Sequence, residues 1–332
     1  MSKAQADGMP QSEASGKSTE TAECEHERRG GSTAAAGRFY GETITMDYID
    51  LHTHSTASDG TFTPAEVYAS ALELNLTAVA LTDHDTVSGL AEFNAAAADH
   101  PECEAVNGVE VACRLEDKEI HIVGLFIDPR SKPLLDMLEF CRNSRMRRNR
   151  DIFLKLRFLG YELSENMPEF NGKTLLDIGR PHFAKALVNH YAFPTLQSAF
   201  DKLLGFNKPA WVKRQYPLPE EVIKNIHLAG GVAVWAHPIL RDVPDRAFLM
   251  RSCRRLKSMG LDGIEGFYSM FSARETLLVA EAAEKYGLKI SGGSDFHGEN
   301  RPNVVIGFGA GGLRVPDKLL YQLKECRAEK FL

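Results

Sequence analysis

Several histidines and acidic residues of this 332-residue chain gather in a few short clusters, and both residue types bind divalent metal ions. The first cluster is Asp50-Leu51-His52-Thr53-His54, and Asp59 follows five residues later. His52 and His54 are two residues apart, so both imidazoles face the same side if the segment is a strand. Because the apolar run 44–49 precedes the cluster, we expect a strand that ends in metal ligands.

Five further clusters follow strand-like apolar runs, and six of the eleven histidines lie in the clusters. Barrel-like α/β folds build their active sites at the C-terminal ends of strands, so these side chains are expected to meet there. The nine candidate ligands are His52, His54, Asp59, His84, Glu110, His121, His237, Asp295 and His297. Nine ligands are too many for one ion and predict two or three. Neutral imidazoles favour Mn²⁺, Fe²⁺ or Zn²⁺ over Mg²⁺.

In their order along the chain these motifs resemble those of the polymerase-and-histidinol-phosphatase (PHP) superfamily of metal-dependent phosphoesterases. The matching motifs are D-L-H-T-H at 50–54, T-D-H-D at 82–85, N-G-V-E at 107–110, A-H-P at 236–238 and G-S-D-F-H-G at 293–298. Segments 179–188 and 208–210 are similar to the branch that acts on nucleoside 3′,5′-bisphosphates and short 5′-phosphorylated RNA. The resemblance implies a distorted (β/α)7 barrel.

The resemblance also implies how the ligands are shared among the ions. The three expected sets are His52 with His54, Glu110 and Asp295; Glu110 with His121 and His237; and Asp59 with His84 and His297. Glu110 would bridge the first two ions. Many superfamily members have His at the position of Asp59, and a carboxylate there weakens the hold of the third site on a soft ion.

Local sequence signals place elements around these clusters. From residue 44 strand-like and helix-like segments alternate, which is typical of α/β architecture. Thr63, Pro64 and Glu66 form a strong helix start, because a capping threonine, a first-turn proline and an early acid all favour one. Residues 116–118 are expected to turn a hairpin.

Residues 131–229 break this alternation with helix-like and initially basic sequence, which predicts an insertion that caps the barrel mouth. The expected organisation is a disordered extension at 1–43, the first part of the barrel at 44–130, the helical insertion at 131–229 and the second part of the barrel at 230–332. The extension is expected to be disordered because it is poor in large apolar residues.

Composition limits which partners the protein is expected to bind and in which compartment it is expected to work. The net charge of −6 and the pI of about 6.0 argue against a broad electrostatic grip on long duplex nucleic acid. Six cysteines without a CxxC pair suit reduced thiols in the cytoplasm. A membrane span is not expected, because no run of about 18 apolar residues occurs.

A cluster of two or three ions predicts a hydrolase, and the resemblance implies that the bond it cleaves is a phosphate ester. Ions roughly 3.5–4 Å apart clamp the attacking and leaving oxygens, and a hydroxide that bridges two of them would attack phosphorus in line. The leaving alkoxide needs a proton, for which Asp85, His182 and a metal-bound water are the candidates. The expected substrate-binding residues are Arg145, Arg148, Arg180, His182 and Lys208, with a solvated basic face or structural pairing as the alternative.

The leading hypothesis is a cytoplasmic, Mn²⁺-dependent phosphatase that converts a nucleoside 3′,5′-bisphosphate such as pAp into a 5′-monophosphate. Trimming of short 5′-phosphorylated RNA from its 5′ end is the second hypothesis. Histidinol phosphatase and amidohydrolase activities, and a metal-stabilised module without catalysis, are the remaining alternatives.

Overall fold

The computed structural model describes residues 38–39, 42–43, 47–170, 174–176, 178–239 and 245–331. The chain divides into two units, Met1–Thr45 and Met46–Leu332. In the first unit β1 (Arg38–Phe39) pairs with β2 (Glu42–Thr43) in an antiparallel ladder. Apart from this pair, the expectation of disorder for 1–43 lies outside the described residues.

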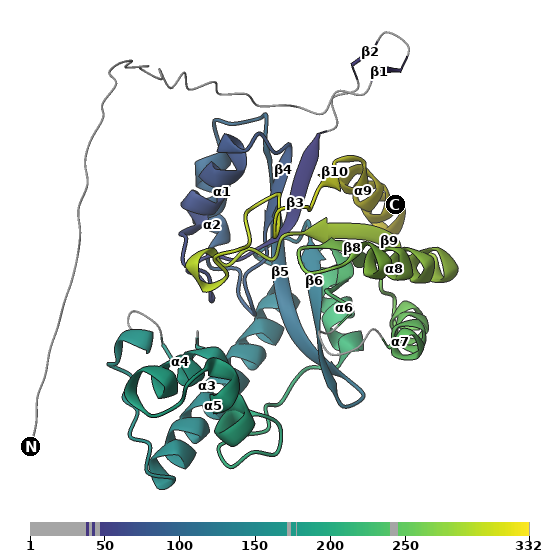
Figure 1. Cartoon of the computed structure of the whole chain (residues 1–332). Helices are drawn as coiled ribbons and strands as arrows, with labels where there is room; N and C mark the ends of the chain where they lie inside the picture. The colour runs from purple at the N-terminus through teal and green to yellow at the C-terminus, as the bar shows by residue number, and fades with distance from the viewer. Residues whose placement is uncertain are drawn as a thin grey trace, which may run out of the picture. The chain divides into compact units, whose positions relative to one another are not determined.

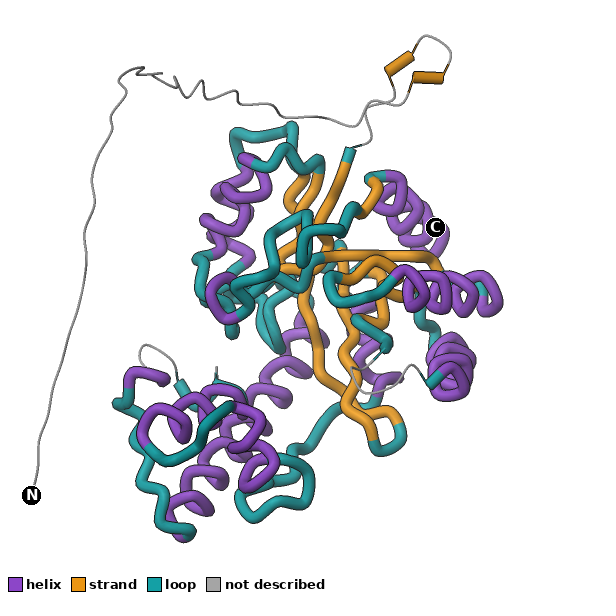
Figure 2. The backbone as a smooth tube through the Cα atoms, in the orientation of Figure 1, coloured by secondary structure: helices purple, strands orange, loops and turns teal. Residues whose placement is uncertain are grey.

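The second unit is built around one mixed sheet with the strand order β10-β3-β4-β5-β6-β7-β8-β9 (Figures 1 and 2). The strands are β3 (Tyr48–Thr53), β4 (Ala78–Leu81), β5 (Glu104–Leu115), β6 (Lys118–Leu125), β7 (Val232–Ala236), β8 (Gly263–Tyr268), β9 (Lys289–Gly293) and β10 (Val315–Pro316). Neighbours are parallel except that β6 is antiparallel to both β5 and β7, and β10 is antiparallel to β3.

Hydrogen bonds between the C-terminal end of β3 and the segment after β9 join the opposite ends of the strand order. The His54 N–H donates to the Phe296 carbonyl at 2.9 Å, and the Asp295 N–H donates to the His52 carbonyl at 2.8 Å. The sheet is therefore a nearly closed barrel, and the α/β class predicted from the sequence is confirmed. The predicted strand over 44–49 was placed too early, because β3 continues through His52; residues 44–46 lie outside the described part of the chain.

Helices cover the outer side of this sheet (Figure 1). They are α1 (Pro64–Glu73), α2 (Leu90–Ala97), α6 (Pro219–Leu228), α7 (Arg246–Ser258), α8 (Ala273–Tyr286) and α9 (Lys318–Phe331). The predicted start of α1 is confirmed as a reciprocal cap. Thr63 Oγ1 accepts from the Glu66 N–H at 3.2 Å, and a Glu66 carboxylate oxygen accepts from the Thr63 N–H at 2.8 Å.

The hairpin of β5 and β6 is the longest ladder of the barrel and carries two expected ligands. Its register runs from Gly108 opposite Leu125 to Leu115 opposite Lys118, so the predicted turn is confirmed. Glu110 and His121 lie inside these strands rather than after them. Side chains two residues apart share a face of a strand, so Glu110 faces the same side as Ala112, which pairs with His121.

The insertion has a small core of its own. Its helices are α3 (Lys132–Phe158), η1 (Pro168–Phe170), α4 (Arg180–His190), α5 (Leu196–Ala199) and η2 (Phe200–Leu204). Buried Ile152, Leu156, Phe183 and Leu204 belong to this core. The start of α3 packs on the barrel core through residues that include Leu134. The buried side of α6 packs on the same core. The division of the chain into four parts stays a proposal. Within α3 the packing changes from the barrel core to the core of the insertion, and at α6 it returns to the barrel core.

Candidate metal centre and active site

The nine predicted ligands converge at one edge of the barrel, with Glu110 at the centre. The Glu110 side chain is fully buried. Its Oε1 lies 2.9 Å from both His121 Nδ1 and His237 Nε2. Its Oε2 lies 3.0 Å from His84 Nδ1 and 3.3 Å from His54 Nε2. One carboxylate thus reaches imidazoles from four different strands or strand ends.

Asp295 and Asp59 flank this centre. Asp295 Oδ1 lies 3.3 Å from His54 Nε2 and 3.7 Å from His52 Nε2. Asp59 lies 3.3 Å from His297 Nε2 and 3.8 Å from His84 Nε2. The donor atoms form three compact groups, which are His54 with Asp59, His84 and His297; His52 with His54 and Glu110; and His84 with Glu110 and His121. Because His54 and His84 each belong to two groups, the sharing of ligands among the ions stays a proposal.

Buried polar atoms without partners show that the residues fit metal ions. Within the described residues, His54 Nδ1, His84 Nδ1 and Glu110 Oε2 are buried and make no hydrogen bond of good geometry, although His84 Nδ1 and Glu110 Oε2 lie 3.0 Å apart. Buried polar atoms are nearly always paired in folded proteins. His52 Nε2 and His54 Nε2 face each other at 3.1 Å. Imidazoles mixed with carboxylates, without thiolates, suit two or more divalent ions of the Mn²⁺, Fe²⁺ or Zn²⁺ type.

The carboxylates make the centre strongly attractive to positive charge. Burial lowers the pKa of His54, but the contacts with Asp295 and Glu110 outweigh it and raise that pKa to about 9. In the same way burial is outweighed by Glu110 and Glu119, so the pKa of His121 rises to about 10. Without metal, His54 and His121 therefore hold protons at neutral pH, and binding of a divalent ion displaces them, whereas burial lowers the pKa of His84.

Glu265, a residue that the motif analysis missed, holds two of the predicted ligands. It lies on β8 and is 3% exposed. Its Oε1 is 3.0 Å from His52 Nδ1, and its Oε2 accepts from the backbone N–H of His237 at 2.6 Å. A charged residue inside the apolar run 263–267 was the signal that could have indicated it.

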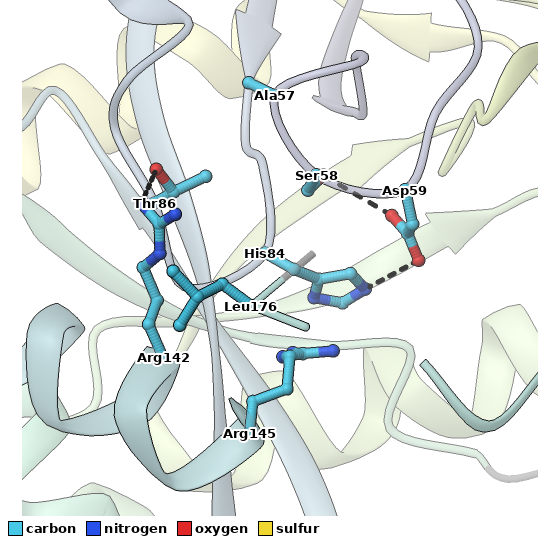
Figure 3. A pocket seen from close by; sticks show the side chains of 8 residues that line it. All are labelled: Ala57, Ser58, Asp59, His84, Thr86, Arg142, Arg145 and Leu176. Carbon is cyan, nitrogen blue, oxygen red and sulfur yellow. Dashed lines mark hydrogen bonds and ion pairs between the residues drawn. The ribbon is translucent and has the colours of Figure 1, made fainter. Parts of the chain in front are cut away.

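Asp83 organises the loop that carries Asp59. Its carboxylate accepts from the Ser55 N–H at 2.8 Å, from the Ser55 hydroxyl at 2.6 Å and from the Ser58 hydroxyl at 2.5 Å. In Figure 3 Asp59 points toward His84, and both residues line a pocket. Arg145 lies in the same pocket, so a cation and two predicted metal ligands face one small space.

The structure argues against Asp85 as the general acid. The side chain is fully buried, and its Oδ2 lies 2.7 Å from Arg145 Nη2 and 2.6 Å from Arg214 Nη2. Burial by itself raises the pKa of Asp85, but the two guanidinium groups hold it well below the usual range. An ionised carboxylate has no proton to give, so Asp85 is better suited to holding the two arginines in place.

The second acid candidate, His182, lies in the first turn of α4. Its Nδ1 accepts from the Gly179 N–H at 3.1 Å, which is the helix-capping role. Arg180 begins the same helix and lies 3.7 Å from a Glu119 oxygen. Lys208 is exposed after η2, and within the described part of the chain it makes no side-chain hydrogen bond or ion pair with the other predicted phosphate ligands.

Arg145, Arg148 and Arg214 form a group that we call the arginine cluster. Arg148 is 6% exposed, and its Nε has no hydrogen-bond partner among the residues that the structure describes. Burial and the nearby charges of Arg145 and Arg214 lower the pKa of Arg148 to about 9. Arg214 lies in a proline-bounded loop outside every motif and was missed. The cluster contains three cations, and Asp85 is the carboxylate that contacts two of them.

Comparison with known proteins agrees with the geometry. The PHP domain family matches residues 50–226. The chain belongs to this family and is a metal-dependent phosphoesterase.

Relatives within the family carry two related names. The chain is 37% identical to a 3′,5′-nucleoside bisphosphate phosphatase of Chromobacterium violaceum, over 79% of this chain and 91% of that protein. It is 33% identical to a 5′-3′ exoribonuclease of Haemophilus influenzae, over 76% and 91%. A solved structure from Chromobacterium violaceum, described as an amidohydrolase with bound SO4 and no metal, has a TM-score of 0.71 at 33% identity and covers 84% of this chain and 96% of its own.

Proposed function

We propose that this protein removes the 3′-phosphate of a nucleoside 3′,5′-bisphosphate such as pAp and releases a nucleoside 5′-monophosphate. The name of the Chromobacterium violaceum phosphatase and its 37% identity over most of both chains support this substrate. The nine predicted ligands provide the site for the phosphate that is hydrolysed, and Mn²⁺ is the proposed ion.

The observation that carries the choice of a bisphosphate is the uncompensated charge of the arginine cluster. A buried guanidinium without an anion is costly, since neither water nor a carboxylate stabilises it. Within the described part of the chain, Arg148 Nε has no hydrogen-bond partner, and the carboxylate of Asp85 is engaged by Arg145 and Arg214. A second substrate phosphate would supply the missing anion, and guanidinium groups bind phosphate with paired hydrogen bonds.

The chain's own residues perform distinct tasks in this proposal. When bound, the ions would supply an acidified water and positive charge for the phosphoryl oxygens. Arg145 and Arg148 bind the second phosphate and orient the ribose, and Asp85 holds Arg145 through an ion pair. The leaving 3′-oxygen needs a proton, and with Asp85 ionised, His182 or a water provides it.

Trimming of short 5′-phosphorylated RNA is the second candidate, and one observation favours it. The pocket that contains Asp59 and His84 shares Thr86, Arg142 and Leu176 with an open groove of about 530 Å³. A groove of this volume can hold a further nucleotide. A mononucleotide substrate would leave the groove empty. We do not retain histidinol phosphate, an amide substrate or a purely structural role, because none of the described features favours them.

Two observations concern where the protein works. Within the described part of the chain, no helix is long and apolar enough to span a bilayer. The described cysteines, Cys103, Cys113, Cys141, Cys253 and Cys326, are all free. Free buried thiols suit a reducing compartment, and we propose that the protein is cytoplasmic.

The test is release of inorganic phosphate from pAp by the Mn²⁺-loaded protein, with a chelator-treated sample as control. We expect chelator-sensitive release from pAp and much slower release from 3′-AMP, which lacks the second phosphate. A 5′-phosphorylated trinucleotide assayed in parallel decides between the two candidates. Equal rates on pAp and 3′-AMP would contradict the role given to the arginine cluster.

A further inference from the structure

Glu119 lies between the insertion and the metal centre and contacts both. It is the second residue of β6, two residues before the predicted ligand His121. Glu119 Oε1 lies 3.6 Å from His121 Nε2, at ion-pair distance. Its Oε2 accepts a hydrogen bond from the Tyr216 hydroxyl at 2.7 Å and lies 3.7 Å from Arg180 Nη2.

Tyr216 extends this set of contacts to the arginine cluster. The guanidinium carbon of Arg214 lies 4.9 Å from the centre of the Tyr216 ring, in cation–π geometry. Arg214 in turn contacts Asp85 at 2.6 Å. A continuous path of contacts therefore runs from Asp85 through Arg214, Tyr216 and Glu119 to His121, although these residues are spread over more than a hundred positions of sequence.

The two nitrogens of His121 face different carboxylates. Nδ1 lies 2.9 Å from Glu110 Oε1, at the metal centre, while Nε2 faces Glu119. A histidine that binds metal through one nitrogen usually gives the N–H of the other to a carboxylate or carbonyl, which fixes the ring orientation and makes the ligand more basic. Glu119 has the position and the charge for that role.

We propose that Glu119, held in place by the Tyr216 hydroxyl, is a positioning residue for His121 and joins the arginine cluster to the metal centre. The pair acts through the ligand and does not touch the reacting atoms. Its effect on metal binding does not depend on the substrate, whereas its effect on turnover rests on the proposed function.

The test uses two variants that each remove one contact and a control on the same hairpin. Glu119→Gln removes the charge that faces His121, and Tyr216→Phe removes the hydroxyl but keeps the ring that stacks on Arg214. Glu116→Gln is the control, because Glu116 lies in the hairpin turn and reaches only Arg255, at 3.9 Å, among the ion pairs of the described residues.

Mn²⁺ binding to the metal-free variants, measured by equilibrium dialysis with elemental analysis, is the first readout. We expect Glu119→Gln to weaken one Mn²⁺ site by roughly 10- to 100-fold, as is usual for partners of ligand histidines. Tyr216→Phe should weaken the same site less, and the double variant should resemble Glu119→Gln because both changes act through one path. Glu116→Gln should bind Mn²⁺ like the parent protein.

Turnover of pAp is the second readout. At limiting Mn²⁺ the kcat of Glu119→Gln should fall, and excess Mn²⁺ should restore it, which a purely structural defect would not allow. Unchanged Mn²⁺ affinity in Glu119→Gln, or a loss of kcat that excess Mn²⁺ does not restore, overturns the proposal. If the parent protein does not hydrolyse pAp, the proposed function fails, and the binding measurement still decides the role of Glu119.

Discussion

Arg148 shows how a single side chain can indicate a ligand. It lies on α3 with 6% of its surface exposed, and its Nε has no hydrogen-bond partner in the described ranges of the chain. Ordinary arginines avoid this state, since burying a charge without a partner costs several kcal/mol. The cost of burying this charge is explained if Arg148 binds an anionic substrate, because residues that serve function often lower the stability of a protein.

We predict that Arg148→Met stabilises the free protein while impairing substrate recognition. Removing an unpaired buried charge should raise the free energy of unfolding by about 1–3 kcal/mol, as measured by urea denaturation. The KM for pAp should rise by roughly tenfold or more, which corresponds to one lost charged hydrogen bond. Arg147→Met is the matched control, because Arg147 is exposed on the same helix and should change neither value. Destabilisation by Arg148→Met would show that the guanidinium has a structural partner.

The ligand residues make a second prediction at this scale. His237→Ala and Asp295→Ala should each lower kcat by on the order of 100-fold or more, since an ion would lose a coordinating group. The circular dichroism spectrum should stay close to that of the parent protein. Full turnover in either variant would contradict the metal assignment, and His100→Ala, at an exposed site remote from every motif, is the control.

At the scale of elements, a strand that carries no predicted ligand helps to hold ligands that belong to other strands. The β8 strand contributes no predicted ligand, yet Glu265 reaches the His52 ring and the His237 backbone, which belong to β3 and the end of β7. His237 has a positive φ of 30°, an uncommon conformation for a residue other than glycine. The hydrogen bond to its N–H helps to hold that conformation.

We predict that Glu265→Gln weakens metal binding by roughly 10- to 100-fold. The amide can still accept from the His237 N–H, but it cannot provide the charge that pairs with the His52 ring. Metal content after dialysis and the Mn²⁺ dependence of turnover are the measurements. Normal metal content would mean that Glu265 serves only the barrel core.

At the scale of the whole molecule, His54 and His121 of the metal centre make stability depend on pH. The pKa values of His54 and His121 are raised to about 9 and about 10 in the metal-free fold, above the usual 6.5 or so of an unfolded chain. Their protonated forms therefore stabilise the fold fully below pH 6.5, and this contribution is lost as the pH rises through 9 to 10.

We predict opposite pH trends with and without metal. The melting temperature of the metal-free protein should fall between about pH 6.5 and 10, whereas the stabilisation by added Mn²⁺ should grow over the same range, since ligand imidazoles must be deprotonated. Thermal denaturation in matched buffers measures both curves. A flat curve for the metal-free protein would mean that these histidines do not hold protons in the absence of metal.

The sequence by itself determined the fold class, the first helix cap, the hairpin and the nine candidate ligands, because all of these depend on local order. Strand periodicity and the position of His and Asp at strand ends can be recognised without tertiary contacts. The structure then showed that the nine side chains converge around Glu110, although His52, Glu110 and His121 lie inside strands rather than after them.

Only the tertiary structure revealed the contacts of Asp85, Glu265, Arg214 and Tyr216. Asp85 looked like a proton donor in the sequence, but Arg214, which is 129 positions away, keeps it ionised. Glu265 stands alone in an apolar strand, and Tyr216 lies in a loop, so neither belongs to a pattern. A side chain's charge state and partners depend on what the fold packs against it, and contacts between distant segments leave no local periodicity in the sequence.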